Sequence, residues 1–93
     1  MKAQEIPMAD VQAVLGPGTE RPLARLMVMF PTLRCLRRTD EHGVHYVFKA
    51  EYGGMRAETE EFPSIPSNLI DVLTEMTSKL IEVIHGYWAD PRD

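Results

Sequence analysis

The sequence has one cysteine, Cys35, so no disulfide can form within the chain. It has no apolar run near the roughly 20 residues that a membrane-spanning helix requires. No apolar run follows Lys2 at the N-terminus either, so the pattern of a signal peptide is missing. We therefore expect a protein of the reducing cytoplasm, without a membrane partner.

Basic residues are scarce: 10 lysines and arginines stand against 14 acidic residues, for a net charge of −4. Because nonspecific nucleic-acid binding depends on cations that neutralise phosphates, this balance disfavours DNA and RNA as partners. One basic cluster could still serve as a nucleic-acid-binding site, and it comprises Arg34, Arg37 and Arg38. We favour another interpretation, a solvated sheet face on which this cluster forms ion pairs with Glu58, Glu60 and Glu61 two strands later.

Groups typical of catalytic or metal sites are few. A zinc site normally needs three or four ligands at matched spacing, and His42 and His45 have only Cys35 and the distant His85 to complete one. Cys35 lies in a predicted strand, where a cysteine usually acts as a small hydrophobic residue rather than a nucleophile. We expect no cofactor, no metal and no enzymatic activity; an enzyme would need a pocket across an oligomer interface, for example near His45 and Glu60.

The chain is 93 residues long with 44% hydrophobic residues, which predicts a single globular domain over 1–93. Residues 1–5 and 89–93 are expected to be loose. A first helix is predicted over 7–15 and ends at Gly16 and Pro17. A second helix is predicted from an N-cap at Thr19 to Phe30, where Pro31 ends it.

The middle of the chain has the alternation of β-strands. Strands are predicted over 32–38 and 44–52, and Gly53-Gly54 predicts a two-residue hairpin into a third strand. This turn sets a register in which two opposite-charge pairs face each other. The predicted pairs are Tyr52–Met55, Glu51–Arg56, Ala50–Ala57, Lys49–Glu58 and Phe48–Thr59.

A long helix is predicted over 67–85, with a C-terminal stop at His85 and Gly86. Its core stripe consists of Leu69, Val72, Leu73, Met76, Leu80, Val83 and Ile84. A second apolar line follows Ile70, Thr77, Ile81 and Trp88. Either both lines are buried within the monomer, or part of the second line forms a partner or dimer surface with Tyr87. The partner-binding residues on the second interpretation are Ile70, Ile81, Tyr87 and Trp88.

These elements predict the α+β class: two short N-terminal helices, a three-stranded antiparallel meander, and a long C-terminal helix packed on one sheet face. Such a sheet has two open edges, so its first or third strand could pair with another chain. The open edges and the broad apolar helix together favour a protein that works by contact with another protein.

Two family resemblances follow from these segments. The order helix, meander, long helix, with a hairpin around 40–48, resembles the double-stranded RNA-binding domain. That family opens its last helix with a lysine cluster, whereas this chain reads Pro-Ser-Asn-Leu-Ile-Asp over 66–71, so the resemblance implies architecture and not RNA binding. Residues 46–84, a hairpin, the turn 62–66 and a helix, resemble HicB-type antitoxins, although the glycine after the second proline is missing.

The function we expect is that of a small non-enzymatic protein-binding module, acting as an inhibitor, antitoxin-like factor or regulatory subunit. It would bind a protein partner, or itself, through the apolar helix surface or an open sheet edge. Small acidic proteins of bacteriophage or mobile-element origin often fit this description, which is an analogy at the level of a class. The alternative is a nucleic-acid-associated protein that uses Arg34, Arg37 and Arg38 on the first strand.

Overall fold

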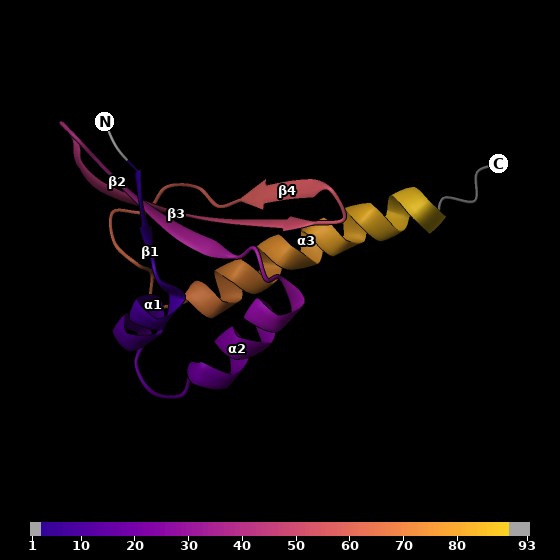
Figure 1. The fold of residues 1–93 in the computed structure, drawn as a ribbon, viewed down its shortest axis with the longest axis horizontal. Coiled ribbons are helices and arrows are strands. Elements are labelled where there is room, and N and C mark those ends of the chain that lie inside the picture. The colour runs from indigo at the N-terminus through magenta and orange to yellow at the C-terminus, as the bar shows by residue number, and fades with distance from the viewer. Residues whose placement is uncertain (1–2, 90–93) are drawn as a thin grey trace.

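Antiparallel strands in the order β1-β2-β3-β4 form the sheet of the computed structural model, which describes the backbone of residues 3–89 and the side chains of 3–84. Helix α3 runs along β3 and β4, and α1 and α2 lie on the same side of the sheet (Figure 1). The predicted α+β class is therefore confirmed. The elements are β1 (Ala3–Ile6), α1 (Met8–Leu15), α2 (Glu20–Met29), β2 (Arg34–Asp40), β3 (Gly43–Tyr52), β4 (Met55–Glu58) and α3 (Leu69–Ala89).

Strand β1 was not expected, so the prediction of a three-stranded sheet is wrong. Residues 3–5 of the segment expected to be loose belong to this strand, and residues 1–2 lie outside the described part of the chain. Ala3–Ile6 pairs with β2 in a register that places Ala3 opposite Arg38 and Ile6 opposite Cys35. The strand has only four residues, too few to show an alternation of its own. Its consequence is topological: β2 is an inner strand, and the edges of the sheet are β1 and β4.

The two N-terminal helices form where predicted, but one cap differs. The carbonyl of Pro7 accepts the N–H groups of Asp10 at 2.9 Å and Val11 at 3.2 Å, which starts α1. The predicted N-cap, Thr19, does not cap α2, because its Oγ1 donates to the carbonyl of Gly16 at 2.7 Å. Threonine hydroxyls readily bond a nearby backbone carbonyl, and here that bond holds the loop between the helices.

The β3–β4 hairpin has the predicted register. Glu51 lies opposite Arg56 and Lys49 opposite Glu58, on either side of the pair Ala50–Ala57. Gly53 and Gly54 form the turn with φ of +59° and +83°, values that residues with a Cβ rarely adopt. The pairing extends past β4, since the N–H of Thr59 donates to the carbonyl of Phe48 at 2.9 Å.

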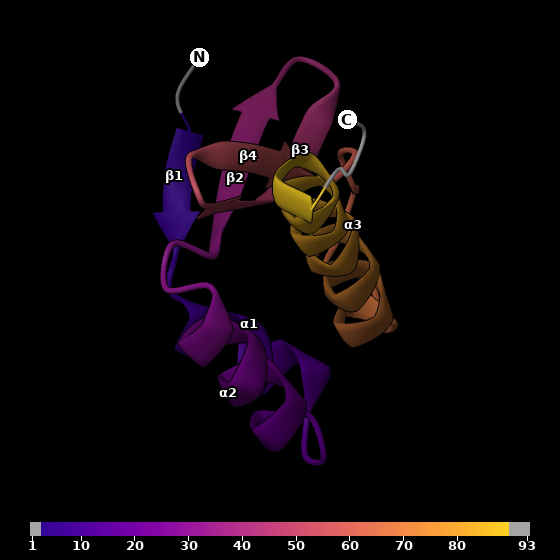
Figure 2. The same cartoon turned by 90° about the vertical axis from the view of Figure 1, so that its right-hand side faces the viewer.

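The core lies between the helices and the sheet face that carries Cys35, Phe48 and Ala50. In Figure 2, α1 and α2 lie together below the sheet while α3 lies beside it. The predicted stripe on α3 is buried at Leu69, Leu73, Met76 and Leu80, whereas Val83 is 52% exposed. The buried apolar residues are Met8, Val11, Leu23, Leu26, Phe30, Leu33, Cys35, Phe48, Ala50, Leu69, Leu73, Met76 and Leu80.

Helix α3 continues through Gly86 to Ala89, so the predicted stop at His85 and Gly86 is wrong. A glycine inside a helix costs about 1 kcal/mol relative to alanine and does not end the helix by itself. Among the described residues, no helix combines the length and the apolar character needed to cross a membrane.

Candidate functional site

The predicted partner surface on α3 lies at the border between core and solvent. Ile70 and Ile81 are half-buried and pack against the core. Thr77, between them on the same line, is buried, and its Oγ1 donates to the carbonyl of Leu73 at 2.8 Å. These residues therefore contribute to the packing of the monomer and offer only part of their surface to a partner.

The other two predicted partner-binding residues, Tyr87 and Trp88, belong to the last turn of α3. Their side chains lie outside the described residues.

The three arginines of the alternative site do not share one face of the sheet. Successive residues of a strand point to opposite faces, so Arg37 lies on the helix side, whereas Arg34 and Arg38 lie on the other face. Arg37 Nη2 donates to Oε1 of Gln4 on β1 at 2.7 Å. The structure thus separates the predicted cluster into two parts.

Arg38 lies in a small network of charged side chains at the C-terminal end of β2. It forms ion pairs with Glu61 and with Asp40, the latter at 4.0 Å. Arg38–Glu61 is the one predicted pair between the cluster and the later glutamates that the described residues form, because Glu58 pairs with Lys49 instead. His45 Nε2 lies 3.2 Å from Oδ1 of Asp40. The N–H of His42 donates to Asp40 and, together with His45 and Arg38, holds the pKa of that carboxyl below its usual range. Arg38 is thus already neutralised within the chain.

The candidate metal ligands are not brought together. His42 is exposed at the β2–β3 turn, and Cys35 is fully buried on the helix side of β2. Across the described part of the chain, no three histidine, cysteine or acidic side chains are arranged to hold a metal ion.

Cys35 is expected to be unreactive in the folded protein. Burial raises the pKa of its thiol to about 11, and the nearby Arg37 offsets only part of this effect. At pH 8 the thiolate population should then be about 100-fold smaller than in an unfolded chain. Labelling with Ellman's reagent should therefore be at least about 100-fold slower for the native protein than in guanidinium chloride. Rapid labelling of the native protein would contradict this prediction.

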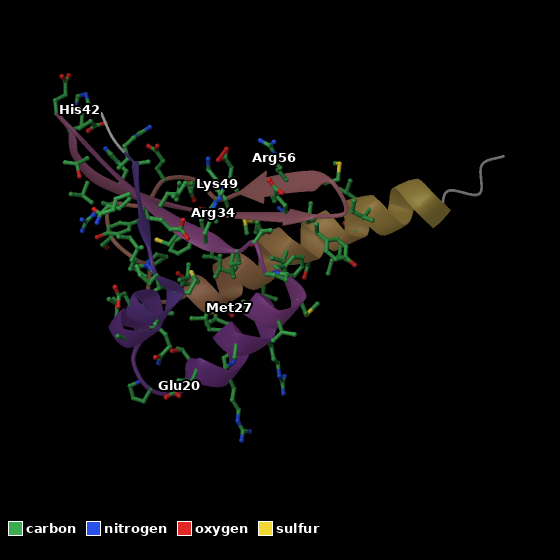
Figure 3. All side chains as sticks on the ribbon, in the orientation of Figure 1. Glu20, Met27, Arg34, His42, Lys49 and Arg56 are labelled. Carbon is green, nitrogen blue, oxygen red and sulfur yellow. The ribbon has the colours of Figure 1, made fainter. Side chains whose placement is uncertain are left out.

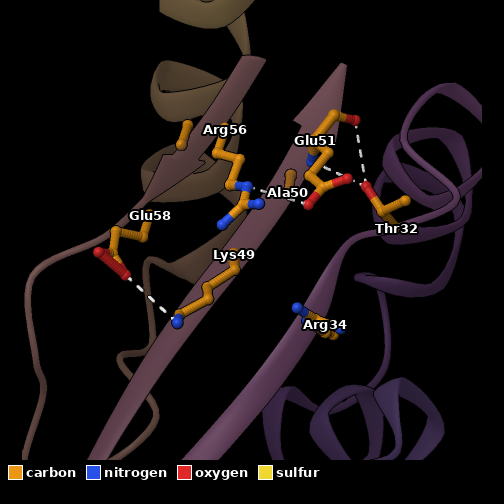
Figure 4. Close-up of a pocket in the computed structure, with 8 residues that line it drawn as sticks. Thr32, Arg34, Lys49, Ala50, Glu51, Arg56 and Glu58 are labelled. Atoms are coloured by element: carbon orange, nitrogen blue, oxygen red, sulfur yellow. Dashed lines mark hydrogen bonds and ion pairs between the residues drawn. The ribbon is translucent and has the colours of Figure 1, made fainter. Parts of the chain in front are cut away.

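The sheet face away from the helices, here called the open face, carries mostly charged side chains. A hollow of about 260 Å³ on it is lined by three cations, Arg34, Lys49 and Arg56, and two carboxylates, Glu51 and Glu58 (Figure 4). Lys49 Nζ lies 3.6 Å from Glu58 and Arg56 Nε lies 3.4 Å from Glu51, as the sequence predicts. These are exposed pairs, each worth at most about 1 kcal/mol, so this hollow is a solvated, mixed-charge surface.

The feature that the sequence did not reveal is a groove between β4 and α3, of about 610 Å³. Its apolar lining includes Met55, which is 42% exposed, and Val83, which is 52% exposed. The half-buried Val72 and Phe62 also line it. Val72 and Val83 were predicted as core residues, because helical spacing places them on the core stripe. A four-residue β4 leaves the side of α3 along this edge only partly covered.

The edge of β4 beside this groove has backbone groups that bond to no other described part of the chain. In an antiparallel ladder, hydrogen-bonded pairs alternate with pairs that are not bonded. The bond between Thr59 and Phe48 fixes this alternation, so Ala57 bonds to β3, whereas Arg56 and Glu58 direct their N–H and C=O groups outward. Figure 3 shows the side chain of Arg56 on the side of β4 away from α3. At Arg56 and at Glu58, an incoming strand would therefore find one backbone N–H donor and one C=O acceptor with which it can form hydrogen bonds.

A scan against protein-family models, a search of curated proteins and a search of solved structures each gave no match to this chain. Its function therefore has to be inferred from the geometry of its own residues.

Proposed function

We propose that the protein is a non-enzymatic protein-binding module whose β4 edge accepts an extended segment of a partner as an additional strand. The observation that carries this proposal is the outward-directed backbone of Arg56 and Glu58 beside the groove between β4 and α3. In strand addition, main-chain hydrogen bonds supply affinity, and pockets for alternate side chains supply specificity. This mode of binding suits an inhibitor, an antitoxin-like factor or a regulatory subunit.

The groove supplies the pockets. Side chains of an added strand alternate between the two faces of the sheet, so every second one would point toward α3. There it would meet Val72 and Val83 on α3 and Met55 on β4. The remaining side chains would lie on the open face beside Arg56 and Glu58. A partner segment with alternating apolar and charged residues therefore fits this edge.

In this mode of binding, the partner contacts the outer edge of β4 and not the second apolar line of α3. Ile81 packs against the core, so its replacement by aspartate would change stability as well as binding. Val83 lines the groove and is more than half exposed, which makes Val83→Asp the better probe of the same helix. Ile70 and Ile81 then support the wall of α3 from the core side.

Replacing Glu58 by proline is expected to abolish partner binding while leaving the fold intact. Proline removes an N–H that points outward, so the pairing between β4 and β3 keeps its bonds. Glu58→Ala is the matched control, because it also removes the ion pair with Lys49 but keeps the N–H. Tagged wild type and Glu58→Ala should retain the same partner from a lysate, and Glu58→Pro should lose at least about 90% of it, a tenfold weakening or more.

Circular dichroism and thermal melts would establish that each variant is folded. Equal capture by the wild type and Glu58→Pro would overturn strand addition at β4. Retention of nucleic acid in place of a protein, weakened by Arg38→Ala and steeply dependent on salt, would favour the alternative function.

A further inference from the structure

We propose that the strand accepted by β4 is the β4 strand of a second copy of this chain, in a two-fold symmetric dimer. In this dimer Arg56 of each copy lies opposite Glu58 of the other. The inference rests on the proposed function and names the partner that binds at that edge.

The outward backbone groups restrict the register of such a pair. Because they belong to Arg56 and Glu58, two identical antiparallel strands can align Arg56 with itself, Glu58 with itself, or Arg56 with Glu58. The first two registers place like charges directly opposite each other, which is destabilising. The third places opposite charges face to face twice, and it sets the small Ala57 against its own symmetry mate. Charge complementarity thus selects one symmetric register.

The hairpin of the monomer already shows this pattern of charges. On its inner side, β4 pairs with Lys49-Ala50-Glu51 of β3, with ion pairs of 3.6 and 3.4 Å. The strand β4 itself reads Arg-Ala-Glu over 56–58, which is the same order of basic residue, alanine and acidic residue. A second β4 would therefore place the same order of charges against the outer edge of β4 that β3 places against its inner edge.

The groove gives the dimer its apolar contact. In the selected register, Met55 and Ala57 of the second copy point to the helix side, where Val72 and Val83 line the groove. Pairing of four-residue strands alone buries little surface, whereas a stable interface buries about 1,200 Å² or more. The exposed Met55 and Val83 are the side chains that the second copy would cover.

The test uses the full chain and two variants, Arg56→Glu and Glu58→Arg, in sedimentation velocity over a range of concentrations. The wild type is expected to form a dimer. Each variant alone should dissociate with a Kd raised at least about tenfold, because both cross-strand pairs become like-charged. Mixed in equal amounts, the two variants should recover the dimer, because the chain with two acidic residues then faces the chain with two basic ones. Recovery also shows that each variant is folded.

Two results would overturn the inference. If the wild type stays monomeric at all concentrations, a second copy is not the partner. Strand addition itself would still be supported if the wild type captures a different protein and Glu58→Pro does not. A dimer that survives both substitutions, or that mixing does not restore, shows that the copies meet elsewhere or in another register.

Discussion

Replacing Phe48 by alanine is expected to lower the free energy of unfolding by about 3–5 kcal/mol. Phe48 lies at the centre of β3, is fully buried, and faces the helices opposite the equally buried Cys35. Removing its ring takes apolar surface out of the core and leaves a cavity that the rigid sheet can only partly close. A domain of this size has a total stability of about 5–15 kcal/mol, so this single change would remove a large fraction of it.

Val44→Ala is the matched control for this substitution. Val44 is on the same strand and points to the same face as Phe48, but it is 38% exposed, and its replacement should cost less than about 1 kcal/mol. Urea titrations followed by circular dichroism would give both values. Equal losses for the two variants would show that the core does not lie where β3 meets the helices.

Phe48 also illustrates what could be predicted from the sequence. The alternation over 44–52 indicates which residues share a face, and Gly53-Gly54 fixes the hairpin register, so this face and two ion pairs follow from local chemistry alone. The same period of two would have separated Arg37 from Arg34 and Arg38, since residues an odd number apart on a strand point to opposite faces. The three arginines therefore do not form one cluster, although they are close together in the sequence.

The proposed site depends on information that local patterns do not contain. Helical spacing assigns Val72 and Val83 to the core side of α3, and that assignment of direction agrees with the structure. Whether a residue on that side is covered depends on how far the sheet extends, and β4 stops after four residues. The groove arises because α3 is much longer than the strand β4 beside it, which is a property of the tertiary structure.

Removing residues 1–6 is expected to lower the free energy of unfolding by about 2–3 kcal/mol, because β1 belongs to the sheet. Ile6 packs against the core opposite Cys35, and Gln4 accepts the hydrogen bond from Arg37. The loss of this burial and of the β1–β2 bonds is partly offset by the entropy of the four residues of β1, which no longer have to be ordered. Gln4→Ala removes only the contact with Arg37 and should cost less than about 1 kcal/mol.

The truncation would also turn β2 into an edge strand. With β1 absent, the edge on this side is the seven-residue β2 in place of the four-residue β1, and a longer open edge promotes association between chains more strongly. Sedimentation velocity of the truncated protein should therefore show more association than that of the full chain. A urea titration should show a lower midpoint of unfolding. An unchanged midpoint would mean that β1 adds nothing to the sheet, and that the core of this fold begins at α1.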